Sequence, residues 1–153
     1  MAASAQRLIQ GVISINAQLH LTEHEKQIII ASFKLIKERK TSLAKRFYEC
    51  LFEFSPLLKP MFTQPFELQQ KHFDKVISDA VNNVNQFDNL LPELQELGDK
   101  HRGKGIIDEH FILVKSAFLL ALQNILNIQY TEDIGNAWGK YIDQISNVIK
   151  QRI

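Results

Sequence analysis

The sequence predicts an all-α protein that folds as one domain with a sizeable core. From Thr22 onward, apolar residues recur every three or four positions, and no stretch of any length alternates as a strand does. Only six glycines and four prolines occur among 153 residues, which favours long helices over the turn-rich chains of all-β folds. A composition of 45% hydrophobic and 23% charged residues is typical of a globular domain, and a domain of this length can enclose an internal ligand.

Residues 1–20 are interpreted as an N-terminal extension of a domain that spans residues 21–153. They contain no Asp or Glu, and Arg7 carries their one fixed side-chain charge. Helical spacing in this stretch is shown by Leu8, Val12, Ile15 and Leu19. We expect an extra helix packed on the core. A patch that joins two subunits in a homodimer and a targeting peptide are the alternatives.

Helix-start signals and apolar stripes define the first half of the domain. Thr22 and Glu25 have the spacing of a capping box, in which each side chain bonds a free backbone N–H at the helix start. The helix that follows is expected to bury Ile29, Phe33 and Ile36, and the next one Leu43, Phe47, Leu51 and Phe54. Ser55 and Pro56 predict a cap and a first-turn proline for a short third helix.

The second half contains the same signals. A helix is predicted to present one face made of Gln69, His72, Phe73, Val76, Ala80 and Val84. A further face comprises Leu90, Leu94, Leu97 and His101, and Gly103 and Gly105 suit the end of that helix. Asp108 is expected to cap a long helix with Phe111, Val114, Phe118, Ala121 and Ile125. Thr131 is expected to cap a last one with Ile134, Trp138, Tyr141, Ile145 and Val148, so seven or eight helices account for the chain.

Charge, cysteine content and apolar run length exclude several classes of function. A formal net charge of +1 gives no field that would attract nucleic acid. The single cysteine, Cys50, cannot form an internal disulfide, which fits a cytoplasmic protein with a buried structural thiol. The longest apolar runs, residues 28–33 and 117–122, are far shorter than the ~20 residues that span a bilayer, so we expect no membrane span. Motifs for structural zinc, zincins, serine hydrolases and P-loops are absent from the sequence.

A few polar side chains lie on faces that are otherwise apolar. His101 follows Leu97 by one helical turn, so its imidazole should point into the core, where each ring nitrogen needs a partner such as a backbone carbonyl or a metal ion. Tyr48 shares a helix face with apolar residues, and a buried phenol needs an acceptor. Each residue alone is better explained as a satisfied core or rim residue. Together with Gln69 and His72, which share a face of another helix, they indicate one common site.

Seven segments resemble haem globins in sequence, order and spacing. They are LTEHEK (21–26), FYECLF (47–52), SPLLKPMF (55–62), DAVNNV (79–84), LGDKHRGKG (97–105), DEHFILV (108–114) and AWGKY (137–141). The resemblance covers residues 21 to about 150 and is to bacterial single-domain globins, the globin part of flavohaemoglobins and neuroglobin. It implies the globin fold, a sandwich of three helices over three, and haem b as the cofactor.

Carried over residue by residue, the resemblance implies a haem site. His101 matches the proximal histidine that binds the iron, and a backbone carbonyl near Leu97 could hold its other ring N–H. Phe62 matches the phenylalanine that stacks on the porphyrin, and Tyr48 the distal tyrosine of bacterial members. The remaining residues expected to line the haem are Phe73, Val76, Leu97, Ile107 and Phe111.

Two residues compete for the second distal position. In the globins that the chain resembles, the distal residue precedes the proximal histidine by 32 residues. The same interval counted back from His101 gives Gln69, with Phe73 one turn deeper, and this match runs without a gap to His101. Counting ten residues on from Phe62 gives His72 instead, with Val76 one turn later. We prefer Gln69, which leaves His72 near a haem propionate. A distal His72 could bind the iron itself and would predict six-coordinate haem.

The resemblance implies reversible binding of oxygen, and also of NO and CO, as in oxygen transport. One alternative is an enzyme, a nitric oxide dioxygenase used in nitric oxide detoxification. The sequence has no room for a flavin or nicotinamide domain, so that enzyme would need a separate reductase. Phe111 stands where flavohaemoglobins usually have tyrosine, and the last helix offers no obvious carboxylate near the proximal side of the haem. A proposed hydrogen-bond partner of His101 is thereby missing, which weakens the enzymatic interpretation. A gas-sensing module, suggested by the N-terminal extension, is the third interpretation.

Overall fold

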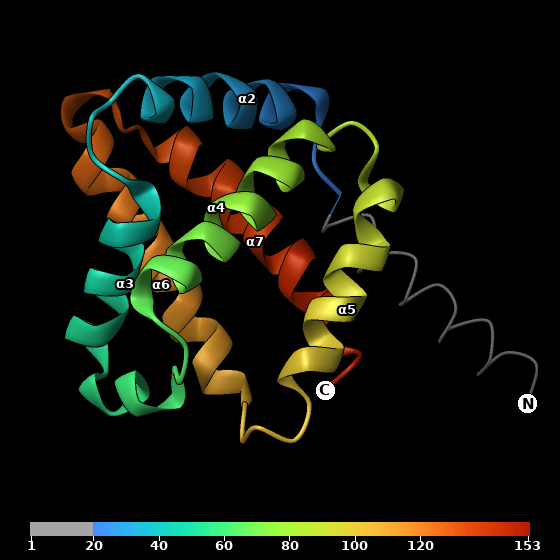
Figure 1. The fold of residues 1–153 in the computed structure, drawn as a ribbon. Coiled ribbons are helices and arrows are strands. Elements are labelled where there is room, and N and C mark those ends of the chain that lie inside the picture. Colours follow the sequence, from blue (N-terminus) through green and yellow to red (C-terminus); the bar gives the residue numbers. More distant parts are fainter. Residues whose placement is uncertain (1–19) are drawn as a thin grey trace, which may run out of the picture.

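The computed structural model describes residues 20–153 as an assembly of helices (Figure 1). The α-helices are α2 (Glu23–Lys37), α3 (Leu43–Phe54), α4 (Phe66–Asn82), α5 (Leu91–His101), α6 (Asp108–Leu126) and α7 (Glu132–Lys150). Short 3-10 helices are η1 (Pro56–Met61), η2 (Phe87–Leu90) and η3 (Asn127–Gln129). No strand occurs between residues 20 and 153, which confirms the all-α prediction. The helix and the subunit contact expected before residue 20 lie outside the described residues.

Helix α7 runs through the middle of the fold. Helix α3 packs along α6, while α2 and α5 pack on α7, and α4 crosses in front of α7 in Figure 1. Two buried hydrogen bonds attach α7 to its neighbours. The Trp138 indole N–H donates to the Ser32 hydroxyl of α2 at 2.8 Å, and the Tyr141 hydroxyl donates to the Ala80 carbonyl of α4. Because a buried polar group left unpaired is costly, these bonds fix where α2 and α4 lie.

The predicted cap residues are confirmed at two helix starts and wrong at a third. Thr22 and Glu25 form both bonds of the capping box, at 2.9 and 3.1 Å, and the Thr131 hydroxyl accepts from the backbone of Ile134. Asp108, however, is the first residue inside α6, and the cap position belongs to Ile107. The backbone N–H of Ile107 donates to Nδ1 of His110 at 3.0 Å, so the side chain that bonds the start of α6 is a histidine and not the aspartate.

The short third helix and two core positions also differ from prediction. Ser55 occupies the cap position of η1, but its side chain makes no capping bond, and η1 is a 3-10 helix with Pro60 inside it. Phe54, expected in the core, is 45% exposed because it ends α3. Val84 is buried as expected but lies beyond the last residue of α4. The remaining residues predicted for the stripes of α2 and α3 are buried.

Helix α6 is long and apolar, although each uninterrupted run of apolar residues within it is short. Within Asp108–Gln129, an 18-residue stretch has a mean hydropathy of 1.7, which is enough for a bilayer span by length and composition alone. Its second half is nevertheless packed in the core, where Ala117, Phe118, Ala121, Leu122, Ile125 and Leu126 are buried. The helix is therefore a core element whose first half presents half-buried apolar side chains.

Candidate functional site

The imidazole of His101 is held through one of its two ring nitrogens. His101 is the last residue of α5, it is half-buried, and its Nδ1 lies 2.6 Å from the carbonyl oxygen of Leu97. Because a carbonyl can only accept, the neutral ring carries its proton on Nδ1 and leaves the Nε2 lone pair free. The contact with Leu97 confirms the expected partner, and it orients the ring as the outer partners of metal-binding histidines do.

The surroundings of His101 do not form a protein-only metal site. Within residues 20–153, no three side chains of His, Cys, Asp or Glu are grouped so that they could hold a metal ion together. A metal bound at Nε2 must therefore bring most of its own ligands, as the iron of a porphyrin does. The donor set thus fits haem better than a bare ion.

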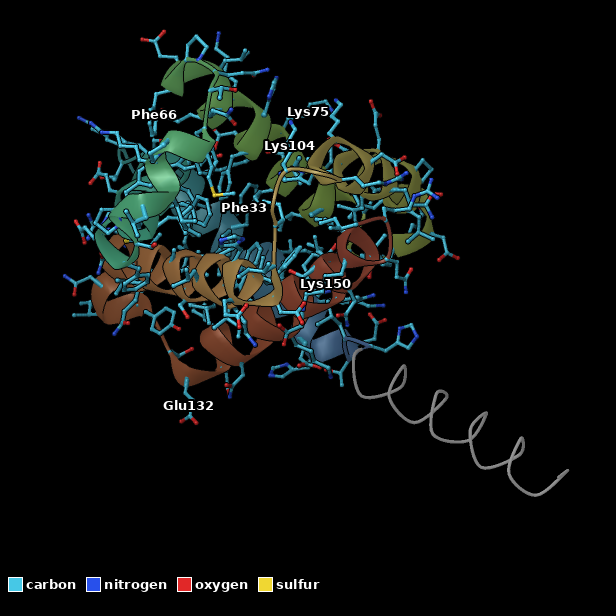
Figure 2. The ribbon with its side chains drawn as sticks, turned by 90° about the horizontal axis from the view of Figure 1, so that it is seen from below. Phe33, Phe66, Lys75, Lys104, Glu132 and Lys150 are labelled. Carbon is cyan, nitrogen blue, oxygen red and sulfur yellow. The ribbon has the colours of Figure 1, made fainter. Side chains whose placement is uncertain are left out.

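The loop after His101 directs the chain toward α6. Arg102 has extended backbone angles, and Gly103 and Gly105 both have a φ of +76°, a conformation that glycine adopts without strain. This confirms the predicted role of the two glycines. Figure 2 views this side of the molecule, with Lys104 on the loop and Phe66 at the start of α4.

Tyr48 lies in a cluster of aromatic rings. Its side chain is 7% exposed, and its ring centroid is 5.0 to 6.0 Å from those of Phe47, Phe52, Phe62, Phe66 and Phe73. The expected acceptor is not found, since the hydroxyl has no hydrogen-bond partner among residues 20–153. Burial, with a smaller contribution from the Asp74 carboxylate, raises the pKa of Tyr48 to about 12. At neutral pH it is a protonated phenol with a free donor.

Helix α4 carries the four predicted distal residues with different burial. Phe73 stacks on Phe47 with a centroid distance of 4.5 Å and contacts Tyr48. Val76 is half-buried and packs against the core, and Gln69 is half-buried as well. His72 is exposed. The structure thus brings Phe73 next to Tyr48, and of the two polar candidates Gln69 is the less exposed.

The remaining predicted residues come from three other segments. Phe62, directly after η1, meets Tyr48 edge-on at 5.6 Å. Leu97 and Phe111 are half-buried, whereas Ile107 is 54% exposed. The Lys150 ammonium lies 5.0 Å from the centre of the Phe111 ring. The last helix therefore places a cation over the Phe111 ring.

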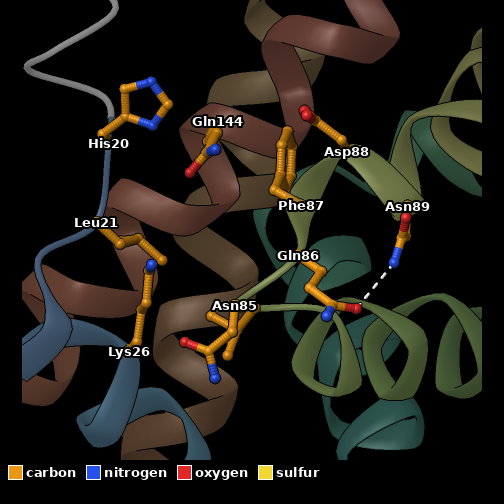
Figure 3. A pocket seen from close by; sticks show the side chains of 10 residues that line it. His20, Leu21, Lys26, Asn85, Gln86, Phe87, Asp88, Asn89 and Gln144 are labelled. Carbon is orange, nitrogen blue, oxygen red and sulfur yellow. Dashed lines mark hydrogen bonds between the residues drawn. The ribbon is translucent and has the colours of Figure 1, made fainter.

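Two surface hollows lie elsewhere. One, of about 510 Å³, is lined by the start of α2, the segment around η2 and Gln144 of α7 (Figure 3). The other, of about 840 Å³, lies where the loop after α2 meets the end of α6. Neither includes any of the predicted site residues, and polar side chains dominate both, unlike the apolar surroundings of Tyr48.

Sequence reasoning found one further ring beside Tyr48 and missed another. The one-turn spacing of Tyr48 and Phe52 predicts that they share a helix face, and Phe52 does stack on Tyr48 at 6.0 Å. Phe66 meets Tyr48 edge-on at 5.6 Å from a different helix. No spacing within one element predicts that second contact.

Comparison with known proteins identifies the family. The globin family model matches residues 45–149. A flavohemoprotein from Bacillus subtilis (strain 168) is 29% identical over 117 residues, which are 74% of this chain and 29% of that protein. Leghemoglobin 3 from Sesbania rostrata is 27% identical over 142 residues, 85% of this chain and 96% of that protein. The chain thus spans about a third of the length of the flavohemoproteins that it matches.

Solved structures share the fold. A bacterial globin from Campylobacter jejuni superimposes with a TM-score of 0.73 and 25% identity, covering 85% of this chain and 97% of that one. A hexacoordinated heme protein from an anhydrobiotic tardigrade gives a TM-score of 0.75 at 23% identity, covering 86% of this chain and 94% of that one. Because the family match extends over most of α3 to α7, the chain belongs to the globin family, haem b proteins that bind diatomic ligands.

Proposed function

We propose that this globin binds oxygen reversibly at a haem b held by Nε2 of His101, and that nitric oxide and carbon monoxide compete for the same position. Haem held by His101 would supply the ferrous iron to which the diatomic ligand binds. The observation that carries the proposal is the fixed tautomer of His101, whose Nδ1 is committed to the Leu97 carbonyl. We place the protein in the cytoplasm because its one cysteine, Cys50, is a buried free thiol.

The apolar residues of the site bind the porphyrin plate and exclude water. The side chains proposed for this role are Phe62, Phe73, Val76, Leu97, Ile107 and Phe111. Burial of apolar area contributes roughly 25 cal/mol per Å², so contact with a flat macrocycle supplies most of the attraction and His101 sets its position. The partial exposure of Leu97 and Ile107 supports this role, since a bound plate would cover them.

Tyr48 is proposed to donate a hydrogen bond to the diatomic ligand. Oxygen on ferrous haem acquires partial negative charge, so a donor aimed at it favours oxygen over carbon monoxide. The hydroxyl has no partner among residues 20–153, and the five surrounding rings limit how far the phenol can turn. Its pKa of about 12 keeps the proton on the phenol throughout the physiological range.

Gln69 is proposed as the second distal donor. Its half-burial on α4, one turn before Phe73, supports this assignment, whereas His72 is exposed. An amide N–H can donate without binding the iron, which leaves the distal position open when no gas is present. The alternative assignment to His72 predicts a histidine on each side of the iron.

The second candidate function is nitric oxide dioxygenation. The similarity to flavohemoproteins favours it, but this chain matches only 29% of the length of the Bacillus subtilis protein. Turnover would require a separate reductase to return the iron to the ferrous state. The partner of His101 disfavours this chemistry, because its Nδ1 is bonded to the Leu97 carbonyl and a neutral carbonyl makes an imidazole less electron-donating than a carboxylate would. A gas-sensing role rests on the N-terminal extension.

A haem titration tests the proposal. Apoprotein titrated with haem should give an intense Soret band that saturates at one haem per chain. His101→Ala should lose the deoxy-ferrous spectrum of a histidine-bound iron, because the carboxyl end of α5 then offers no imidazole. The exposed His24, on α2, provides the matched control, and His24→Ala should behave as the wild type does. A protein that stays folded but binds no haem contradicts the proposal, and so does an unchanged spectrum in His101→Ala.

A further inference from the structure

Basic residues are concentrated where α2 ends and α3 begins. Residues 34–46 hold six of the chain's 18 Lys and Arg side chains and one of its 17 Asp and Glu side chains. The net charge of +1 therefore conceals a strongly positive segment in a chain that is otherwise acidic. Exposed charges act over about 10 Å at ordinary ionic strength, so a partner responds to this local field more than to the total. The basic residues are Lys34, Lys37, Arg39, Lys40, Lys45 and Arg46.

Most of these cations have no acidic partner in the fold. Of the segment's basic residues, only Arg46 takes part in an ion pair within residues 20–153, with Glu49 and Glu53. Elsewhere on the molecule, Lys115 and Lys140 each lie within 3.0 Å of a carboxylate oxygen. The positive charge of the segment is thus not neutralised internally and is available to an anionic partner.

A surface hollow collects three of these side chains. Arg39, Lys40 and Arg46 line the hollow of about 840 Å³ beside the end of α6, and no acidic side chain of the described residues joins them there. The Arg39 guanidinium donates to the Gln129 side chain of η3, and Nε of Arg46 donates to Oδ1 of Asn124 at 2.8 Å. Because an amide carries no net charge, neither bond neutralises the cation that it orients.

An exposed isoleucine lies directly beside these cations. Ile128 belongs to η3, next to the Gln129 that Arg39 bonds, and it is 93% exposed, more than any other large apolar side chain of the described residues. Figure 1 shows the loop after α2 and the turn between α6 and α7 at one corner of the fold, away from α5. We call Arg39, Lys40, Arg46 and Ile128 the basic corner. An apolar side chain beside unpaired cations fits a surface that is anionic outside and apolar just beneath.

We propose that the basic corner docks this protein on the surface of an anionic phospholipid bilayer. Lipid phosphate groups meet Arg39, Lys40 and Arg46, and Ile128 enters the boundary between headgroups and acyl chains. Clusters of about four to eight Lys and Arg are typical of segments that bind anionic lipids, and each cation near such a surface strengthens binding about fivefold. Docking of this kind requires neither haem nor a spanning helix, so the inference is independent of the proposed function.

The segment around η1 exposes apolar side chains without this charge. Leu57 is 86% exposed there, but residues 53–71 contain two basic and two acidic side chains. Peripheral binding to a bilayer draws on apolar insertion and on attraction to anionic lipids together, and η1 offers only the first. This segment therefore supplies matched controls, an exposed leucine and exposed lysines that lie outside the basic corner.

Vesicle binding by the purified full chain tests the proposal. Bound protein is measured by co-sedimentation with vesicles of phosphatidylcholine and phosphatidylglycerol, and with vesicles of phosphatidylcholine alone. The wild type should bind only the anionic vesicles and should be released as salt is raised, because salt screens surface charges. Arg39→Gln combined with Lys40→Gln should weaken binding about 25-fold, the effect of two cations. Ile128→Ser should weaken it at least fivefold, on the order expected for one apolar side chain that stays in water.

The controls make the same kinds of change outside the basic corner. Lys59→Gln combined with Lys71→Gln, and separately Leu57→Ser, should bind vesicles as the wild type does. All of the altered side chains are exposed, so the melting temperature should stay the same across the series.

Three outcomes would overturn the proposal. Equal weakening in the controls would mean that total charge or general stickiness determines binding. Unchanged binding in the corner variants would assign the interaction to another part of the chain. Inorganic tripolyphosphate is the soluble probe, and if it binds at Arg39 and Lys40 while anionic vesicles do not bind, the corner takes a free polyanion and not a lipid surface.

Discussion

Two side chains, His101 and Tyr48, are proposed to determine the chemistry of the haem site. His101 supplies a nitrogen donor whose tautomer is fixed by the Leu97 carbonyl at 2.6 Å. Tyr48 supplies a hydroxyl that has no other partner within residues 20–153. A hydroxyl that bonds nothing else in the described residues can donate to a ligand, and removing the hydroxyl alone tests this role.

Tyr48→Phe should speed oxygen dissociation at least tenfold, equivalent to about 1.4 kcal/mol, because one buried hydrogen bond to the ligand is lost. The rate measured by stopped-flow should be flat between about pH 6 and pH 9 in the wild type, since the pKa of Tyr48 is raised to about 12. Tyr130→Phe, at a half-buried tyrosine beside the start of α7, is the control and should have the wild-type rate. If the two variants release oxygen equally fast, the Tyr48 hydroxyl does not contact the ligand.

Individual elements show which features the sequence could predict. Apolar periodicity and the bonds of Thr22 and Glu25 depend on residues close together in the chain, and these predictions are confirmed. The prediction of Asp108 as the cap of α6 was wrong. Ile107 occupies the cap position with an extended backbone, and its N–H donates to the His110 side chain. Which face a helix buries depends on neighbours that periodicity does not identify, as the exposed Phe54 at the end of α3 shows.

The contacts that position the site were largely beyond sequence reasoning. His101 and Tyr48 could be found because each is polar on an apolar face, and the Leu97 carbonyl follows from helix geometry. Phe66 meets Tyr48 from another helix, and Gly98 meets α7 some fifty residues further along the chain. Such pairs are determined by how helices pack, and one sequence gives no measure of that.

Helix α4 makes its own prediction, about the coordination of the iron. With Gln69 as the distal residue, the deoxy-ferrous form should be five-coordinate and high-spin, and His72→Ala should leave its absorption spectrum unchanged. Gln69→Leu should speed oxygen release because one donor is lost. A low-spin spectrum that His72→Ala converts to high-spin would instead assign the distal position to His72, and would place that exposed side chain in the site once haem is bound.

The whole molecule positions His101 through α7. This helix is attached to α2 by Trp138 and to α4 by Tyr141, and it meets α5 at Gly98. Because α7 has no large freedom to move against these neighbours, the end of α5 is placed by the fold as a whole. The fold also accounts for the apolar α6, whose second half is buried in the core and whose first half carries Phe111, one of the residues proposed to line the haem. A compact helical domain can in this way present one nitrogen donor to a large apolar cofactor.

The central claim is that Nε2 of His101 binds the iron, and a cavity variant tests it most directly. His101→Gly should bind haem without a proximal protein ligand and show an altered deoxy-ferrous spectrum. Added imidazole should enter the space left by the side chain and restore the spectrum of the wild type. If His101→Gly has the wild-type spectrum before imidazole is added, the iron is held by another residue and the account is wrong.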